Sequence, residues 1–301
     1  MTSFLEQVLG VDSCEWCSRS CTKSTETPQH PTVYRYVQAH GQDEDAVHNF
    51  GAYMSPRDSE QDDMQHSPTE HVGIGMEDGT VYTGQCIRNT RHGNGVLVHP
   101  DGEKYGGEFQ DGCYHGHGCV SFPNGDKYEG QWKEDEPHGH GTYTYKDGSC
   151  VYEGQWEHNA KSGHGKETFS DGSRYDGEFL RGARHGEGEY KTSSNNLYTG
   201  QFKQGKFHGE GDYSWMDGKV YKGQWEHGTI SGYGKMKYPK GYYYDGEFLK
   251  GEKHGKGVFV QPDGSMYRGQ WRNGKQHGNA LVKGRDGVEL PSRWEYGKKV
   301  E

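Results

Sequence analysis

The chain has 301 residues, and 49 of them are glycine, a share of about 16 % where proteins average roughly 7 %. Hydrophobic residues reach only 29 % but aromatic residues reach 13 %, with 22 tyrosines, so a core of leucine, isoleucine and valine is excluded and any core must be aromatic. The formal net charge of -10 leaves no basic surplus, which excludes nucleic acid as a partner.

Residues 1–71 differ in composition from the rest of the chain. They are rich in polar residues and hold 12 acidic against 4 basic residues, so most of the net negative charge lies here. This composition is typical of a mostly disordered segment. Ser3 and Glu6 match a capping box, which predicts a short helix that ends at Gly10.

Three cysteines, Cys14, Cys17 and Cys21, follow this predicted helix. S-acylation of these thiols beside an apolar helix would anchor the chain to a membrane. Alternatively, the FLEQVL stretch docks on a partner as a linear motif, or the thiols have no function. Zinc is disfavoured, because no fourth ligand lies near them. The acidity of the segment argues against electrostatic adhesion to anionic lipid.

The sequence contains no run of 18 apolar residues and no signal-peptide pattern, so neither a transmembrane helix nor secretion is expected. Seven cysteines at irregular spacing do not form a disulfide framework. These features predict a cytoplasmic location.

From residue 72 onward, a motif of Tyr, any residue, Gly, and Gln or Glu recurs nine times. Successive tyrosines are 23 residues apart, except for one step of 24. The tyrosines are Tyr82, Tyr105, Tyr128, Tyr152, Tyr175, Tyr198, Tyr221, Tyr244 and Tyr267. An aromatic residue follows the Gly by two positions in eight units, and a His-Gly-x-Gly or Ser-Gly-x-Gly stretch follows a short turn. This period predicts a repeat array.

Alternation within each unit predicts two antiparallel strands. Tyr175, Gly177 and Phe179 are spaced by two and share one face of the first strand, and Gly186 and Gly188 are expected to share that face on the return strand. The other face is mainly polar, as in a half-buried antiparallel sheet. Glycine or asparagine at the first turn, and stretches such as Pro-Asp-Gly at the second, complete a β-hairpin.

The strand glycines are expected to let aromatic rings lie flat over the backbone. Aromatic pairs add about 0.5–1.5 kcal/mol each beyond area burial. Because lone hairpins are marginally stable, stability should accumulate along the array.

The pattern Tyr-x-Gly-[Gln/Glu]-[Trp/Phe]-x-x-Gly-x-x-His-Gly-x-Gly resembles the MORN (membrane occupation and recognition nexus) repeat family. The resemblance covers residues 72–301 as about nine and a half repeats, the half repeat having Leu290 in place of tyrosine and ending near Trp294. It implies an all-β fold, an elongated single-layer twisted antiparallel sheet of stacked β-hairpins, with aromatic residues along a groove. Cys86 in the first unit and Ala280 in the last depart from the pattern, which suits capping repeats.

Enzyme chemistry and metal binding are disfavoured. Equivalent histidines of neighbouring units would lie two strands apart, ~9–10 Å, which is too far for a shared zinc ion, so no metal or cofactor is expected. The His-Gly-x-Gly stretch precedes a strand rather than a helix, unlike phosphate-binding loops. Acidic residues are expected on the polar face, and no catalytic triad or dyad stands outside the repeat pattern.

We therefore expect a non-catalytic scaffold that binds a protein partner, as an extended peptide, a helix or a coiled-coil segment, in the aromatic groove. Exposed rings would anchor the partner. The resemblance implies that the chain organises a cytoskeletal, ciliary or membrane-associated structure. The candidate groove residues are Tyr128, Trp132, Tyr152, Trp156, Tyr175, Phe179, Tyr198, Phe202, Tyr221, Trp225, Tyr244 and Phe248.

The alternative is a membrane-apposition protein. It would be anchored by S-acylation of the three N-terminal cysteines, or would bind phosphoinositides through the repeats, although the near-neutral charge of the repeats disfavours the latter. Exposed edges of the sheet could also support a homo-oligomer.

Overall fold

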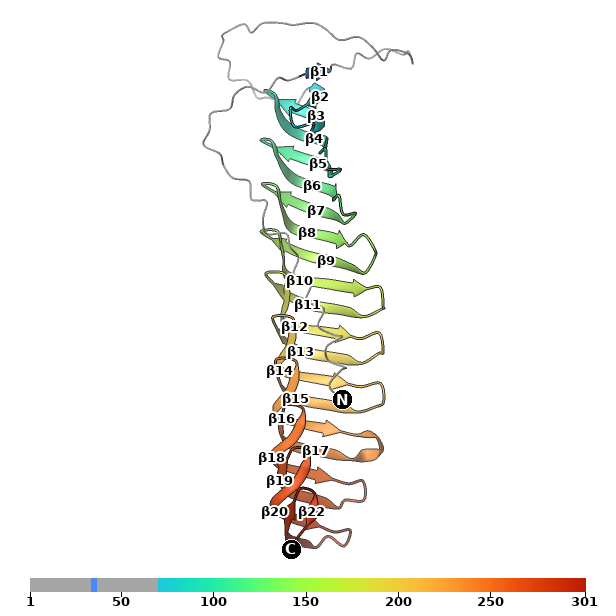
Figure 1. The fold of residues 1–301 in the computed structure, drawn as a ribbon, viewed down its shortest axis with the longest axis vertical. Coiled ribbons are helices and arrows are strands. Elements are labelled where there is room, and N and C mark those ends of the chain that lie inside the picture. The colour runs from blue at the N-terminus through green and yellow to red at the C-terminus, as the bar shows by residue number, and fades with distance from the viewer. Residues whose placement is uncertain (1–33, 37–69) are drawn as a thin grey trace. The chain divides into compact units, whose positions relative to one another are not determined.

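A computed structural model describes residues 34–36 and 70–301. They belong to two compact units, one that ends at Pro137 and one that begins at His138. Both are built of antiparallel strands, and the described residues contain no α-helix, only a short 3-10 turn at Pro239–Gly241. The predicted all-β class is therefore confirmed (Figure 1).

The first unit is an antiparallel sheet in which each strand pairs with the next one along the chain. Its strands are β1 (Tyr34–Tyr36), β2 (Glu70–Gly75), β3 (Val81–Ile87), β4 (Thr90–Val98), β5 (Lys104–Gln110), β6 (Cys113–Ser121) and β7 (Lys127–Lys133), and β8 (Glu136–Thr144) starts at the boundary. The sequence pattern did not predict β1, which pairs Tyr34 with Gly75 and Tyr36 with Gly73.

The second unit continues the same hairpin pattern. Its further strands are β9 (Cys150–Glu157), β10 (Ala160–Phe169), β11 (Arg174–Leu180), β12 (Ala183–Lys191), β13 (Leu197–Lys203), β14 (Lys206–Ser214), β15 (Val220–Glu226), β16 (Thr229–Lys237), β17 (Tyr243–Leu249), β18 (Glu252–Val260), β19 (Met266–Arg272), β20 (Lys275–Lys283), β21 (Glu289–Glu295) and β22 (Lys298–Lys299). From β8 to β22, each strand pairs only with its neighbours in sequence, so within this unit the described sheet is open.

The first turn of each hairpin has the backbone conformation that its residue types predict. Gly182 has a φ of 84°, and where glycine is absent Asp135 and Asn159 take φ values of 67° and 63°. This left-handed region is easiest for glycine, asparagine and aspartate.

The first glycine of each His-Gly-x-Gly stretch has a different role from the one predicted. Gly186 has a φ of 60° and lies at a register shift between β11 and β12, beside the Glu178 carboxylate rather than beneath a ring. The backbone N–H of Glu187 donates a hydrogen bond of 3.3 Å to Glu178 Oε1. The same bond recurs elsewhere, as from His164 N–H to Gln155 Oε1 at 2.8 Å. It explains why Gln or Glu follows the Gly of each Tyr-x-Gly motif.

The second glycine lies beneath a ring, as predicted. A Cβ added to Gly188 would lie 2.6 Å from Cε2 and from the hydroxyl oxygen of Tyr175, and Gly188 pairs directly with Gly177. The paired glycines therefore form a bare strip of backbone over which the motif tyrosine lies, whereas in the last unit Ala280 stands opposite Gly269. The face of the sheet that carries these tyrosines is called the aromatic face below, and the opposite one the polar face.

The core of each unit is a chain of edge-to-face aromatic contacts on the aromatic face. Tyr175 contacts Phe179 of its own strand at 5.2 Å between ring centroids, and Phe202 of the next repeat at 4.9 Å. In the second unit such contacts continue from Tyr152 to Trp294. The half repeat therefore contributes a strand, β21, and a ring that packs against Tyr267. Edge-to-face geometry is the favoured arrangement of aromatic pairs.

Candidate functional site

The twelve candidate groove residues are buried, with 0 to 8 % of each residue exposed. They are therefore the core of the sheet, and the expectation that they stand open to solvent is wrong. The physical reason is that each ring is covered by the rings of the adjacent repeats. Their part in partner binding stays a prediction.

Polar atoms of these core rings are satisfied internally. The Tyr175 hydroxyl donates a hydrogen bond to the backbone oxygen of Glu178 at 2.8 Å, and Trp225 Nε1–H donates one to the Gly211 carbonyl at 3.1 Å. Burial raises the pKa of Tyr175, and it raises that of Tyr82 to about 12. A ring in this layer thus offers a partner little surface and no free polar group.

A second layer of side chains lies over the motif tyrosines. It comes from the residue that precedes the His or Ser of each return strand, which we call the covering position. Tyr114 stacks on Tyr105 at 3.7 Å between centroids, and Phe207 stacks on Tyr198 at 3.8 Å. The covering residues, apart from Pro137 at the boundary of the units, are Arg91, Tyr114, Lys161, Arg184, Phe207, Ile230, Lys253 and Gln276. Because these residues differ in chemical type from repeat to repeat, the sequence pattern did not reveal the covering position.

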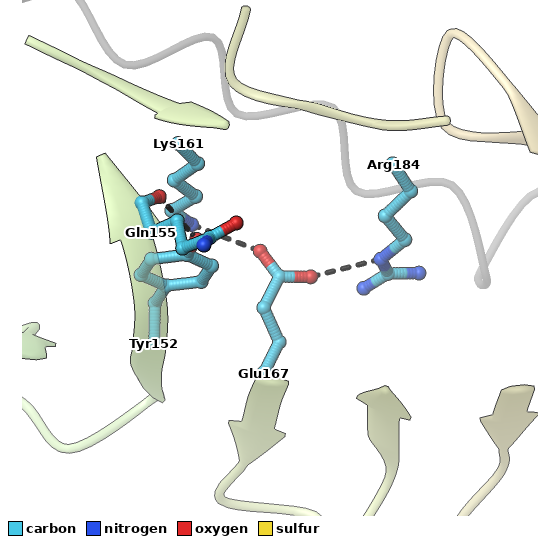
Figure 2. A network of polar contacts seen from close by, with 5 residues as sticks. All are labelled: Tyr152, Gln155, Lys161, Glu167 and Arg184. Carbon is cyan, nitrogen blue, oxygen red and sulfur yellow. Dashed lines mark hydrogen bonds and ion pairs between the residues drawn. The ribbon is translucent and has the colours of Figure 1, made fainter. Parts of the chain in front are cut away.

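Two cations of the covering position share one carboxylate in the second unit. Lys161 Nζ donates to Glu167 Oε1 at 2.9 Å and Arg184 Nε donates to Glu167 Oε2 at 2.8 Å, and Figure 2 shows Glu167 between them. The three side chains are only 10 to 15 % exposed. Acidic residues in general were expected on the polar face, and Glu167 is an exception that lies on the aromatic face. It lies where other repeats place an aromatic residue such as Tyr143 or Tyr190.

Electrostatics and aromatic contacts both hold this triad. Burial raises the pKa of Glu167, but the positive charges of Lys161 and Arg184 and their hydrogen bonds outweigh it, so its pKa lies below the usual value. Lys161 Nζ lies 4.8 Å from the ring centre of Tyr152, and the Arg184 guanidinium lies 5.0 Å from that of Tyr175. Cations at such distances are attracted to the ring face.

Lys253 occupies the covering position four repeats after Lys161, but its surroundings differ. Its Nζ lies 5.2 Å from the ring centre of Tyr238, 5.2 Å from Tyr244, 4.5 Å from Phe259 and 5.0 Å from Trp271. Within the described chain it has no ion pair within 4.0 Å. Burial lowers the pKa of Lys253 from 10.5 to about 8.

Half-buried rings flank the covering residues and reach solvent. They are Tyr145, Phe169, Trp215, Tyr238 and Phe259. Trp215 contacts Tyr213 at 4.4 Å between centroids, and Arg184 lies 5.3 Å from the ring centre of Phe169, which places both rings on the aromatic face. These rings and the covering residues form what we call the outer layer.

The polar face carries exposed charged pairs. Lys222 pairs with Asp212, and Lys235 Nζ lies 3.2 Å from Asp245. Tyr233, which is 57 % exposed, donates a hydrogen bond to Asp245 at 2.5 Å. Among residues that the structure describes, no group of three His, Cys, Asp or Glu side chains could hold a metal ion. Cys14, Cys17, Cys21 and the predicted N-terminal helix lie outside the described residues.

Comparison with known families decides the identity of the repeat. The MORN repeat matches nine times, at residues 82–104, 105–127, 128–150, 152–174, 175–196, 198–220, 221–241, 244–266 and 267–288. The chain belongs to the MORN-repeat family. The nine matches begin at the nine motif tyrosines, so the predicted MORN array is confirmed.

Two solved structures are distantly similar to this MORN array. The TCP10 domain of Danio rerio CPAP, in complex with a peptide of Danio rerio STIL, is 12 % identical, with a TM-score of 0.40, over 74 % of this chain and 98 % of that one. The Drosophila melanogaster SAS-4 (dCPAP) TCP domain, in complex with a proline-rich motif of Ana2, is 12 % identical, with a TM-score of 0.30, over 60 % of this chain and 85 % of that one. No curated protein matches the chain. Among the described residues, no helix has the length and apolar character needed to cross a bilayer.

Proposed function

We propose that this MORN-repeat chain is a non-catalytic scaffold that binds a protein segment on the outer layer of its aromatic face. The observation that carries the proposal is the row of half-buried rings at Tyr145, Phe169, Trp215, Tyr238 and Phe259. Aromatic side chains held in a fixed orientation supply contact area at little cost in conformational entropy, and such residues dominate binding energy in protein interfaces.

The buried rings have a supporting role in this proposal. They fix the height and orientation of the outer layer, as Tyr198 does for Phe207 through a 3.8 Å stack. A partner would meet the outer layer first. Direct contact with the twelve core rings, where their edges reach the surface, stays a prediction.

The cellular setting is part of the proposal. We infer from the family resemblance that the bound partner belongs to a cytoskeletal, ciliary or membrane-associated structure. Attachment to a membrane through Cys14, Cys17 and Cys21 is a separate proposal, supported by their position beside an apolar stretch. Replacing all three by serine should release a membrane-bound fraction into the soluble one, and an unchanged distribution would contradict the anchor.

Partner capture by matched variants tests the scaffold. The outer-layer variant combines Tyr145→Ser, Trp215→Ser and Tyr238→Ser. The control variant combines Tyr233→Ser, Leu180→Ser and Leu249→Ser, which remove exposed apolar groups away from the outer layer. Proximity labelling in the native cell should lose its main partner with the first variant and keep it with the second. Retention by the outer-layer variant, or loss by the control, would contradict the proposal.

A further inference from the structure

Two lysines occupy equivalent places in repeats that lie 92 residues apart, yet among the described residues only Lys161 has a carboxylate partner. Lys161 pairs with Glu167, six residues further along its return strand, at 2.9 Å. Lys253 stands in the same place on β18, and the residue six positions further is Phe259. The repeat thus provides an internal comparison of a satisfied and an unsatisfied ammonium group.

The described surroundings of Lys253 remove the ammonium group partly from water, and none of these residues supplies an anion in its place. Four rings lie within 5.2 Å of Nζ, and the phenyl ring of Phe259, at 4.5 Å, is the nearest of them. Attraction to ring faces offsets part of the lost hydration. Burial alone lowers the pKa of this lysine, with no contribution from an acidic side chain.

We propose that Lys253 and its surrounding rings form a binding site for the carboxylate of an acidic side chain on a partner protein. Charge complementarity favours this occupant. An ammonium group that is partly removed from water only donates hydrogen bonds, and a carboxylate both accepts them and supplies the opposite charge. The half-buried rings of Tyr238 and Phe259 would contact the apolar part of the same segment. The inference rests on the proposed function, because it names the chemistry of the segment that the outer layer binds.

A single substitution can give Lys253 a carboxylate partner from its own chain. Phe259→Glu places a carboxylate where Glu167 stands in the Lys161 repeat, so Lys253 would gain an internal partner. Phe259→Gln is the matched control, because it has nearly the same size and shape but no charge. The difference between the two variants isolates the carboxylate.

Competitive labelling of the full chain with acetic anhydride, read by mass spectrometry at each lysine, measures the occupancy of the site. The probes are a short peptide, acetyl-Gly-Leu-Glu-Leu-Gly-amide, and its counterpart with Gln in place of Glu. Only the neutral amine reacts, so at a pH below the pKa of Lys253 the Glu peptide should slow labelling of this residue by about tenfold for each pH unit by which it raises that pKa. Lys256, an exposed residue of the same strand, should be unaffected.

The Glu peptide should protect Lys253 in the wild type and in Phe259→Gln, but add no protection in Phe259→Glu, whose Lys253 should already react slowly. Equal protection of the wild type by the Gln peptide, or no protection by either, overturns the inference even if Phe259→Glu fails to fold. Faster labelling of Lys253 after Asp43→Asn, Glu44→Gln and Asp45→Asn, without peptide, would assign the site to this chain's own acidic segment and also overturn it.

Failure of this inference is distinguishable from failure of the proposed function. If the outer-layer variant loses its partner but Phe259→Glu keeps it, the scaffold stands and the carboxylate site is wrong. If the outer-layer variant keeps its partner, the proposed function itself is wrong, whatever the labelling shows.

Discussion

The ring of Tyr175 lies across Gly188 on the neighbouring strand, so closely that a Cβ at residue 188 would come within 2.6 Å of ring atom Cε2. Real Cβ atoms do not approach other heavy atoms so closely, so either the ring or the strand would have to move. Interiors packed at native density tolerate such insertions poorly. The glycine is therefore a requirement of the aromatic layer rather than of a turn.

Replacing Gly188 by alanine should destabilise β11 and β12 by about 1–3 kcal/mol, because the added methyl group displaces the Tyr175 ring. Hydrogen exchange of the amides of these two strands measures the local free energy of opening, which suits a repeat protein whose units need not unfold together. Gly106 provides the control, since an added Cβ would meet only Val96 at 3.8 Å. Equal effects of Gly188→Ala and Gly106→Ala would contradict the packing account.

Alanine substitution of a buried and of a half-buried tryptophan should have different effects on stability. Trp156 is 8 % exposed and donates a hydrogen bond to the Gly141 carbonyl at 3.1 Å, so Trp156→Ala should cost about 3–5 kcal/mol in stability. Trp215→Ala, at a half-buried ring, should cost less than about 1 kcal/mol. Chemical denaturation of both variants checks this contrast. A small effect at residue 156 would mean that this ring is not part of the core.

The repeat pattern was sufficient to predict the fold but not the accessible surface. The 23-residue step and the alternation around Tyr175 predict the hairpins, the aromatic face and the role of Gly188. They do not reveal that rings from adjacent repeats bury one another, because this depends on distances between strands. The interpretation of the ring row as an open groove was therefore wrong.

The sequence pattern did not predict the outer layer, for a different reason. The covering position carries residues as unlike as Phe207 and Lys253, so no motif marks it. One signal was present in the sequence, since Glu167 interrupts a column of otherwise apolar residues on the aromatic face. Searching the two flanking covering positions for cations would have found Lys161 and Arg184.

Replacing Glu167 by glutamine should destabilise the second unit by about 3–5 kcal/mol at neutral pH, because two nearly buried cations lose their shared anion. Asp176→Asn is the matched control, since the Asp176 and Lys166 side chains are 43 % and 62 % exposed, and should cost less than about 1 kcal/mol. Thermal unfolding compared at one pH measures both changes. Similar losses in the two variants would show that burial of the triad does not matter.

The contribution of Glu167 should also depend on pH. Its folded-state pKa lies below the usual value of 4.5, so the stabilisation is fully present above about pH 4.5 and is lost as the pH falls through the lower folded-state pKa. The difference in unfolding free energy between the wild type and Glu167→Gln should therefore be constant, within the error of the measurement, from about pH 6 to about pH 7, and it should shrink in acid. A difference that grows in acid would contradict the ion-pair assignment.

Lys253 should show the opposite sign. Its pKa is lowered from 10.5 to about 8, so between these values the unfolded chain binds more protons than the folded one, and the wild type gains stability as the pH rises. Lys253→Met should therefore be more stable than the wild type at neutral pH, by about 1 kcal/mol because water still reaches part of the lysine. This advantage should shrink above pH 8. Lys256→Met should change stability little at any pH in this window.

Photo-cross-linking tests the central claim most directly. A benzoylphenylalanine residue replaces either Trp215, in the outer layer, or Tyr233, on the polar face, and the full chain is irradiated in its native cell. We predict that the partner found by proximity labelling is cross-linked from position 215 and not from position 233. Cross-linking of that partner from position 233 alone would contradict the assignment of the aromatic face as the binding surface.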